Sequence, residues 1–193
     1  HYNACKDKDK MIKFIEKIKL ESLNNDIKYY IVDIRNNWGG DSSVIYPLIG
    51  FLKNKKVVTL INENVFSSGR MALIELKKMD SYIIGTNIST SLNAFGNVPG
   101  EYFIDELGLK VKRSSTYWYY DANLNCKGFR KGEFEEYFKD NKNLLEPIIF
   151  EPDQYVYMTI DDTINNNDSQ LNAAIEYIKN RSSIKKMNRE LII

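Results

Sequence analysis

The stretch that decides the fold is Tyr29-Tyr30-Ile31-Val32-Asp33-Ile34, followed at once by Arg35-Asn36-Asn37-Trp38-Gly39-Gly40. The first six residues form a largely apolar run of strand length, which predicts a strand buried on both faces, as in a parallel sheet. The next six are polar and rich in glycine, and helical spacing returns over residues 43–53. The sequence therefore predicts a strand, a polar loop and a helix in direct succession.

The same succession recurs on both sides of this stretch. Upstream, residues 6–23 have the spacing of an amphipathic helix. Downstream, residues 57–61 and 82–84 form two more strand-like runs, with a helix expected over residues 68–79 between them. This alternation predicts an α/β class of fold with layers of helices around parallel strands.

The character of the chain changes after residue 98. Residues 103–104, 109–112 and 116–120 alternate in the manner of strands, and Leu107-Gly108 suits a hairpin turn. Residues 121–143 are charged and read as irregular, with a short helix over 132–140. A last amphipathic helix is expected over residues 168–180, and the remaining residues, 181–193, are expected to form a fraying tail.

Composition excludes several classes of function. The 193 residues include 27 Lys and Arg against 26 Asp and Glu, so the net charge of +1 removes the main electrostatic argument for nucleic-acid binding. No apolar run approaches the roughly 20 residues that span a bilayer. The single histidine is His1, and Cys5 and Cys126 are the two cysteines, so a His-rich or Cys-only metal site is excluded. No metal or organic cofactor is implied.

The glycine-rich loop is the first segment that could carry chemistry. Gly39 and Gly40 allow backbone amides to approach a ligand closely, and amides at a strand end ahead of a helix suit an oxyanion. The alternative is a turn in which the glycines only relieve strain. Within the loop, Asp33 and Arg35 are expected to pair and brace it, and Trp38 is expected to pack by its large apolar area.

The stretch Asn62-Glu63-Asn64-Val65-Phe66-Ser67-Ser68-Gly69 is the second such segment. A strand ends, a tight turn follows, and a serine lies where a helix begins. The positive end of the helix dipole favours a developing alkoxide on such a serine, and the amide after it can donate to an oxyanion. The alternative is that Ser67 or Ser68 is only an N-cap.

Taken together, the two segments resemble those of the C-terminal processing, or tail-specific, serine peptidases, which are related to the tricorn core. Further matches lie over residues 1–178, in Tyr2-Asn3-Ala4-Cys5, Tyr82-Ile83-Ile84-Gly85, Asn93-Ala94-Phe95-Gly96 and Glu151-Pro152-Asp153. The resemblance implies a Clp-protease/crotonase-like layered fold of β-β-α units. It also implies a peptidase-like catalytic domain over residues 1–180, with residues 181–193 as a tail.

The resemblance implies roles for individual residues as well. Ser67 would be the nucleophile, and the oxyanion donors would be the amides of Ser68 and Gly40, or of Gly39. The substrate would be a polypeptide in an extended conformation, paired to a strand edge. Members of the family are usually exported or face the cell envelope, so the same location is expected here. The resemblance does not indicate an oligomeric state.

The general base is where the sequence departs from the family. Most members have a lysine in a pattern like Gly-Glu-Pro-Thr-x-Gly-Lys, but here the stretch reads Gly85-Thr86-Asn87-Ile88-Ser89-Thr90-Ser91 and places Ser91 at the lysine position. His1 is a candidate replacement, because its pKa suits a base near neutral pH. A lysine from elsewhere in the fold is the other candidate, and burial would have to lower its pKa. Two alternatives follow: a catalytically impaired relative that binds extended peptides or protein partners, and a crotonase-like acyl-thioester enzyme.

Overall fold

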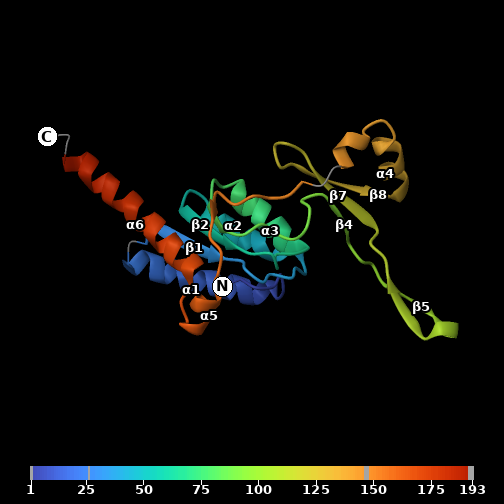
Figure 1. Cartoon of the computed structure of the whole chain (residues 1–193), viewed down its shortest axis with the longest axis horizontal. Coiled ribbons are helices and arrows are strands. Elements are labelled where there is room, and N and C mark those ends of the chain that lie inside the picture. Colours follow the sequence, from blue (N-terminus) through green and yellow to red (C-terminus); the bar gives the residue numbers. More distant parts are fainter. Residues whose placement is uncertain (1, 26, 146–147, 191–193) are drawn as a thin grey trace. The chain divides into compact units, whose positions relative to one another are not determined.

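The computed structural model describes residues 2–25, 27–145 and 148–190, of which residues 182–190 are described by their backbone alone. It divides into two compact units. The first unit contains the residues up to Ser89 and those from Glu151 onward, and the second contains Thr90–Phe150. The second unit is thus inserted in the chain between two parts of the first (Figure 1).

A four-stranded parallel sheet forms the centre of the first unit. Its strands, in spatial order, are β1 (Tyr29–Asp33), β2 (Lys56–Ile61), β3 (Tyr82–Gly85) and β9 (Gln154–Tyr155). The three strands expected from the sequence are confirmed, and so is their parallel direction. The two-residue β9 was not predicted, because it is too short to show an alternating pattern.

The core of this sheet lies along β2, where every residue from Val57 to Ile61 is buried. One cluster joins Val58, Leu60 and Ile84 of the sheet to Ala174. Five consecutive buried residues match the continuous run expected of a strand covered on both faces. By contrast, β1 lies at one edge of the sheet and is only partly buried, so the prediction that this strand is buried on both faces is wrong.

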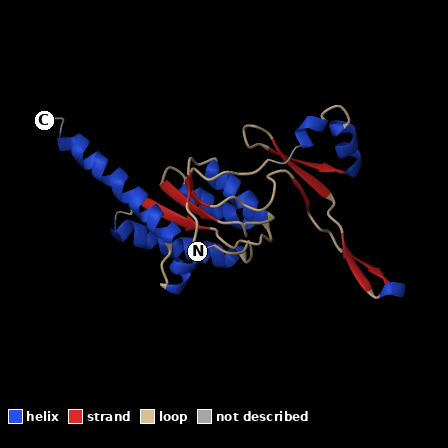
Figure 2. Cartoon of the chain, in the orientation of Figure 1, coloured by secondary structure: helices blue, strands red, loops and turns tan. Residues whose placement is uncertain are grey.

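Helices cover the sheet of the first unit (Figure 2). They are α1 (Lys8–Asn25), the 3₁₀ turn η1 (Ser42–Ile45), α2 (Tyr46–Leu52), α3 (Ser68–Lys77), α5 (Ile160–Ile164) and α6 (Ser169–Glu190).

Two expectations about these helices were wrong. α6 continues to Glu190, ten residues past its predicted end at residue 180. In α1, Met11 and Ile15 of the predicted apolar face are buried, but Phe14 and Leu23 are exposed. The amphipathic pattern located this helix correctly and overstated how much of its apolar face packs.

The second unit has an antiparallel sheet of β4 (Ala94–Gly96), β7 (Thr116–Tyr120) and β8 (Cys126–Arg130). The helix α4 (Lys131–Phe138) and the 3₁₀ turn η3 (Lys142–Leu145) follow. Its core is aromatic and contains Tyr117, Phe129 and Phe138. Strand β8 corrects the expectation of an irregular segment over residues 121–143. Its residues other than Phe129 are exposed, so it carries no hydrophobic pattern.

A separate two-stranded hairpin completes the second unit. It consists of β5 (Glu101–Ile104), the 3₁₀ turn η2 (Asp105–Leu107) and β6 (Leu109–Lys112). Gly108 has a φ of +61°, the left-handed conformation that glycine adopts without strain. The hairpin predicted from Leu107-Gly108 is therefore confirmed.

Candidate active site

Ser67 has an unusual backbone conformation. It follows β2 and takes the N-cap position of α3 with φ of +52° and ψ of −124°, a region that side-chain-bearing residues seldom occupy. Its side chain makes no capping hydrogen bond, so the N-cap alternative is not supported. The residue is exposed, and within the described part of the chain its hydroxyl has no hydrogen-bond partner. A strained turn thus presents a free hydroxyl at a helix N-terminus.

The glycine-rich loop lies directly against this turn. A Cβ on Gly39 would lie 2.7 Å from the Cβ of Ser67 and 2.8 Å from the amide nitrogen of Ser68. The hydroxyl of Ser68 donates to the carbonyl oxygen of Gly40 over 2.6 Å. The two segments singled out from the sequence are therefore in contact, and glycine is required at position 39 for the approach.

Two backbone amides remain available beside the serine. Among the described residues, the N–H groups of Gly40 and Ser68 have no acceptor. The N–H of Gly39 already donates to Oδ1 of Asn37 over 2.9 Å. Of the three donors named from the sequence, Gly40 and Ser68 are the two whose amides are open to a ligand.

Asn37 joins the loop to the serine turn, a role that sequence reasoning missed. It is fully buried. Its carbonyl oxygen accepts from the N–H of Phe66 over 2.9 Å, and its Nδ2 donates to the carbonyl oxygen of Tyr2 over 2.8 Å. The repeated asparagines of this loop were the signal available, since buried asparagine commonly replaces backbone hydrogen-bond partners in irregular segments.

The segment before α1 runs parallel to the glycine loop. The N–H of Tyr2 donates to the carbonyl oxygen of Asp33, and the N–H of Cys5 donates to that of Gly39 over 2.9 Å. The N–H of Asp41 donates to the carbonyl oxygen of Cys5 over 2.8 Å. Burial raises the pKa of the Cys5 thiol, which keeps it protonated near neutral pH. Cys5 is thus a structural contact of the loop, and both cysteines are free.

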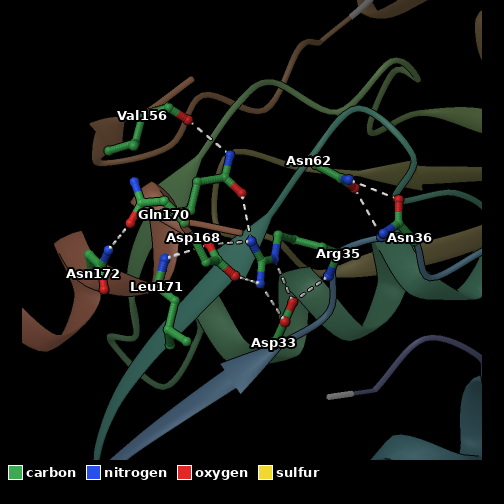
Figure 3. Close-up of polar contacts among 10 residues, drawn as sticks. Asp33, Arg35, Asn36, Asn62, Val156, Asp168, Gln170, Leu171 and Asn172 are labelled. Atoms are coloured by element: carbon green, nitrogen blue, oxygen red, sulfur yellow. Dashed lines mark hydrogen bonds and ion pairs between the residues drawn. The ribbon is translucent and has the colours of Figure 1, made fainter. Parts of the chain in front are cut away.

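The expected pair of Asp33 and Arg35 is confirmed and is part of a larger network (Figure 3). Nε and Nη2 of Arg35 donate to the Asp33 carboxylate over 2.9 and 2.8 Å. Nη1 and Nη2 donate to Asp168 over 2.8 and 2.7 Å, and Nη1 also reaches Oε1 of Gln170 over 3.1 Å. The guanidinium is fully engaged, so Arg35 braces the loop.

The charges of this network reinforce one another. Hydrogen bonds to Asp33, together with those to Asp168, raise the pKa of Arg35 above its ordinary value. Hydrogen bonds from Arg35 lower the pKa of Asp168. Asp168 also accepts from the N–H of Leu171 and so caps α6. The start of α6 is thereby fastened to the end of β1.

A cavity of about 380 Å³ lies at the carboxyl ends of the parallel strands. Its lining includes Asp33 at the end of β1, Asn62 after β2, Thr86 after β3 and Tyr157 after β9. This edge is where open parallel sheets bind ligands.

The aromatic residues beside the serine turn correct one expectation. Trp38 is 65% exposed, so the prediction that it packs is wrong. Phe66, which directly precedes Ser67, is 50% exposed. Both rings are available to a ligand.

Of the two residues considered for the position of the base, Ser91 and His1, the structure describes Ser91 alone. Ser91 belongs to the second unit, where its hydroxyl accepts from the N–H groups of Asn93 and Ile148 over 3.2 and 3.0 Å. His1 lies outside the described residues. The region that the structure describes therefore supplies a candidate nucleophile and two amides, and leaves the base open.

The described residues lack both a metal-binding cluster and a membrane-spanning helix. They contain no group of three or more His, Cys, Asp or Glu side chains arranged to hold a metal ion. None of their helices has the length and apolar character needed to cross a membrane.

Comparison with known proteins shows a likeness of fold. No family model matches the sequence, and no curated protein matches it. A crystal structure described as that of a "putative peptidase" from Parabacteroides merdae is 14% identical with a TM-score of 0.54, over 89% of this chain and 56% of that one. The tricorn protease is 21% identical with a TM-score of 0.45, over 79% of this chain and 15% of that one.

The photosystem II D1 C-terminal processing protease is 12% identical with a TM-score of 0.46, over 80% of this chain and 40% of that one. The chain thus spans less than two thirds of the length of each of these proteins. The first likeness shows a shared α/β fold, and the two TM-scores below 0.5 carry no further weight. The chain therefore has a mixed α/β fold, with a parallel sheet, of the kind found in a protein described as a peptidase.

Proposed function

We propose that the first unit is the catalytic part of a serine peptidase of the C-terminal processing type, with Ser67 as its nucleophile. The observation that carries the proposal is the backbone of Ser67, held at φ of +52° and ψ of −124° without any capping bond. Such strain costs on the order of 1–3 kcal/mol and persists at functional sites. The same strained strand-to-helix turn presents the nucleophile in other serine hydrolases.

The reaction follows from the groups around this turn. The hydroxyl oxygen of Ser67 attacks the carbonyl carbon of a peptide bond as a general base accepts its proton. The amides of Gly40 and Ser68 donate to the oxygen that becomes negative in the tetrahedral intermediate. Collapse of the intermediate breaks the C–N bond, and the amine leaves with the proton that the base held. Water then hydrolyses the acyl-enzyme and restores Ser67.

We assign the role of base to His1. Its ordinary pKa of about 6.5 suits proton transfer near neutral pH. Ser91 cannot replace it, because a neutral hydroxyl does not take a proton from another hydroxyl at this pH. Loss of a general base typically lowers the rate about 10²–10⁴-fold, so the identity of this residue decides whether the centre is active.

The proposed substrate is a polypeptide in an extended conformation. Main-chain hydrogen bonds to a strand edge hold such a substrate without requiring a particular sequence. The exposed rings of Trp38, which precedes Gly39, and of Phe66, which precedes Ser67, offer apolar area to such a substrate. We also propose that the first unit has the layered Clp/crotonase-like arrangement. The proposed location of the protein is outside the cell or at the cell envelope.

A second function stays in view because one observation favours it. Within the described part of the chain, the Ser67 hydroxyl has no hydrogen bond to a basic group, and the position that is lysine in most of the resembled family is Ser91. A relative without a working base would still bind extended peptides through the same amides and strand edge.

A fluorophosphonate probe separates the two functions. We expect the probe to add one phosphonyl group to Ser67, as seen by intact mass and peptide mapping, and Ser67→Ala to abolish it. Ser22→Ala is the control, since the Ser22 hydroxyl donates to the carbonyl oxygen of Ile18 within α1 and accepts from the hydroxyl of Tyr30. Labelling that persists in Ser67→Ala would contradict the assignment. A folded protein that binds an extended peptide and is never labelled is the binding relative.

The base is tested by the pH dependence of labelling. With His1 as base, the labelling rate rises through a pKa of about 6.5. His1→Ala then lowers the rate at pH 7.5 by about 10²-fold or more and removes the inflection. An unchanged inflection in His1→Ala would assign the base elsewhere.

A further inference from the structure

The hairpin of β5 and β6 is a sheet with no covering layer among the described residues. Every residue from Asn97 to Arg113 is exposed, and the two strands pair only with each other. An isolated two-stranded hairpin is marginally stable in water and becomes stable when one of its faces is packed.

One face of this hairpin is apolar, and the other carries three charged residues and Phe103. The register pairs Tyr102 with Val111 and Ile104 with Leu109, and cross-strand partners share a face, so these four residues form one apolar face. Their exposed fractions range from 38 to 51%. The opposite face holds Glu101, Phe103, Lys110 and Lys112. We call the first of these the apolar face of the hairpin.

The opposite face is already satisfied within the hairpin. Glu101 forms ion pairs of 3.2 Å with both Lys110 and Lys112, and these contacts lower the pKa of Glu101. The ammonium group of Lys110 also lies over the ring of Phe103, 5.1 Å from its centroid. A charged face whose groups are paired with one another is stable when exposed to water, whereas exposure of the apolar face is unfavourable.

Charges of opposite sign flank the apolar face at its two ends. Asp105 and Glu106 lie in the turn at the tip, and within the described part of the chain neither forms an ion pair. Arg113 lies at the base, with its guanidinium 5.7 Å from the centroid of the Tyr102 ring on the apolar face. It has no acidic partner among the described residues. The face is therefore acidic at its tip and basic at its base.

We propose that this apolar face packs against the same face of a second copy of the chain, with the two hairpins antiparallel. A two-fold axis makes any surface patch meet itself, so the patch must be self-complementary. Antiparallel stacking places Asp105 and Glu106 of one hairpin beside Arg113 of the other, twice over. Parallel stacking would oppose like charges at both ends, which is why the charge pattern selects the antiparallel dimer.

The size of the face sets the strength of this dimer. A stable interface usually involves about 20–30 residues on each side, and this one offers four apolar side chains with three flanking charges. We therefore expect a weak dimer that forms with rising concentration.

Sedimentation equilibrium of the full chain, from about 1 to several hundred micromolar, tests the proposal. We expect a monomer–dimer equilibrium that Tyr102→Ser weakens about tenfold or more, since a buried aromatic side chain dominates such a small contact. Phe103→Ser is the matched control on the opposite face and leaves the dissociation constant unchanged. A monomer at every concentration, or equal effects of the two variants, would overturn the proposal. Far-UV circular dichroism confirms that both variants fold.

A charge exchange tests the antiparallel arrangement independently of the apolar contact. Arg113→Glu places three acidic groups together and weakens the dimer. Adding Asp105→Lys and Glu106→Lys to Arg113→Glu reverses both ends and restores the dissociation constant to within a few-fold of the original. A triple variant that stays as weak as Arg113→Glu alone would rule out antiparallel pairing.

Discussion

The glycines of the two units differ in what surrounds them. In the first unit, a Cβ on Gly40 would collide with the carbonyl oxygen of Cys5, and one on Gly85 would collide with that of Ile61. In the second unit, a Cβ on Gly100 meets nothing within 4 Å, and one on Gly128 meets only the Trp118 and Thr116 side chains. The glycines beside the site and at the end of β3 are thus packed against backbone, whereas Gly50 of the first unit and these two glycines of the second unit are not.

Gly40→Val tests this difference most severely. Gly40 has a φ of +135°. The clash is with the backbone of Cys5, so the loop must shift from Cys5 and its hydrogen bond with the Ser68 hydroxyl is disturbed. We expect a loss of about 4 kcal/mol in the free energy of unfolding, together with loss of probe labelling at Ser67. Urea denaturation and mass spectrometry measure the two effects.

Gly100→Val is the control in the second unit, and we expect a change within about 0.5 kcal/mol. If the two valine variants had equal stability, the contrast between the units would be lost.

Phe138→Ala probes the side-chain packing of the second unit. Phe138 is buried in the aromatic cluster with Tyr117 and Phe129, so its truncation leaves a cavity that costs about 3–4 kcal/mol. We expect hydrogen exchange to accelerate in β7 and β8 while labelling of Ser67 is retained. Tyr137→Ala, on the more exposed face of α4, has a smaller effect. Loss of Ser67 labelling in Phe138→Ala would show that the aromatic core also supports the site.

Asn37→Ala tests a buried side chain that joins the glycine loop to the serine turn. The substitution leaves the N–H of Gly39 and the carbonyl oxygen of Tyr2 without the hydrogen bonds that they form with the Asn37 side chain. We expect about 2–3 kcal/mol of destabilisation in thermal or urea unfolding. Asn64→Ala, which removes a single exposed bond to Asn36, should cost less than about 1 kcal/mol. A similar loss of stability in the two variants would mean that Asn37 does not hold the glycine loop against the serine turn.

Asp168→Asn gives the smallest effect and a pH dependence. The pKa of Asp168 is lowered by Arg35, so its contribution is complete above the unfolded pKa of about 3.9 and declines as the pH falls through and below that value. Because the carboxylate is partly exposed, we expect about 1 kcal/mol of destabilisation at pH 7. The difference between the two proteins should shrink below pH 4. A constant difference from pH 7 to pH 3 would exclude the ion pair as its cause.

Local patterns in the sequence predicted the features that depend on neighbouring residues. The buried run of β2, the parallel strands, the turn at Gly108 and the pairing of Asp33 with Arg35 all follow from short-range spacing and charge. The turn at Ser67 was located as well, although its backbone strain was not foreseen, because strain depends on the surrounding loop.

The sequence could not predict features that depend on distant partners. Asp168 and Gln170 join Arg35 across more than 130 positions, and no spacing rule links them. Trp38 was expected to pack because of its size, yet whether a ring is covered depends on what the rest of the chain places over it. Strand β8 was missed because it is defined by pairing with β7 rather than by its own pattern.

The insertion of the second unit between β3 and β9 has a consequence for the order of folding. The hydrogen bonds between Arg35 and Asp168 cannot form until Asp168 has been synthesised, 133 residues after Arg35. At about 5–20 residues per second, the delay during translation is on the order of ten seconds. The first three strands emerge early, but the loop beside Ser67 gains this brace only after Asp168 has been synthesised. A chain that ends before Asp168 would therefore carry Ser67 beside a loop that lacks part of its ion-pair network.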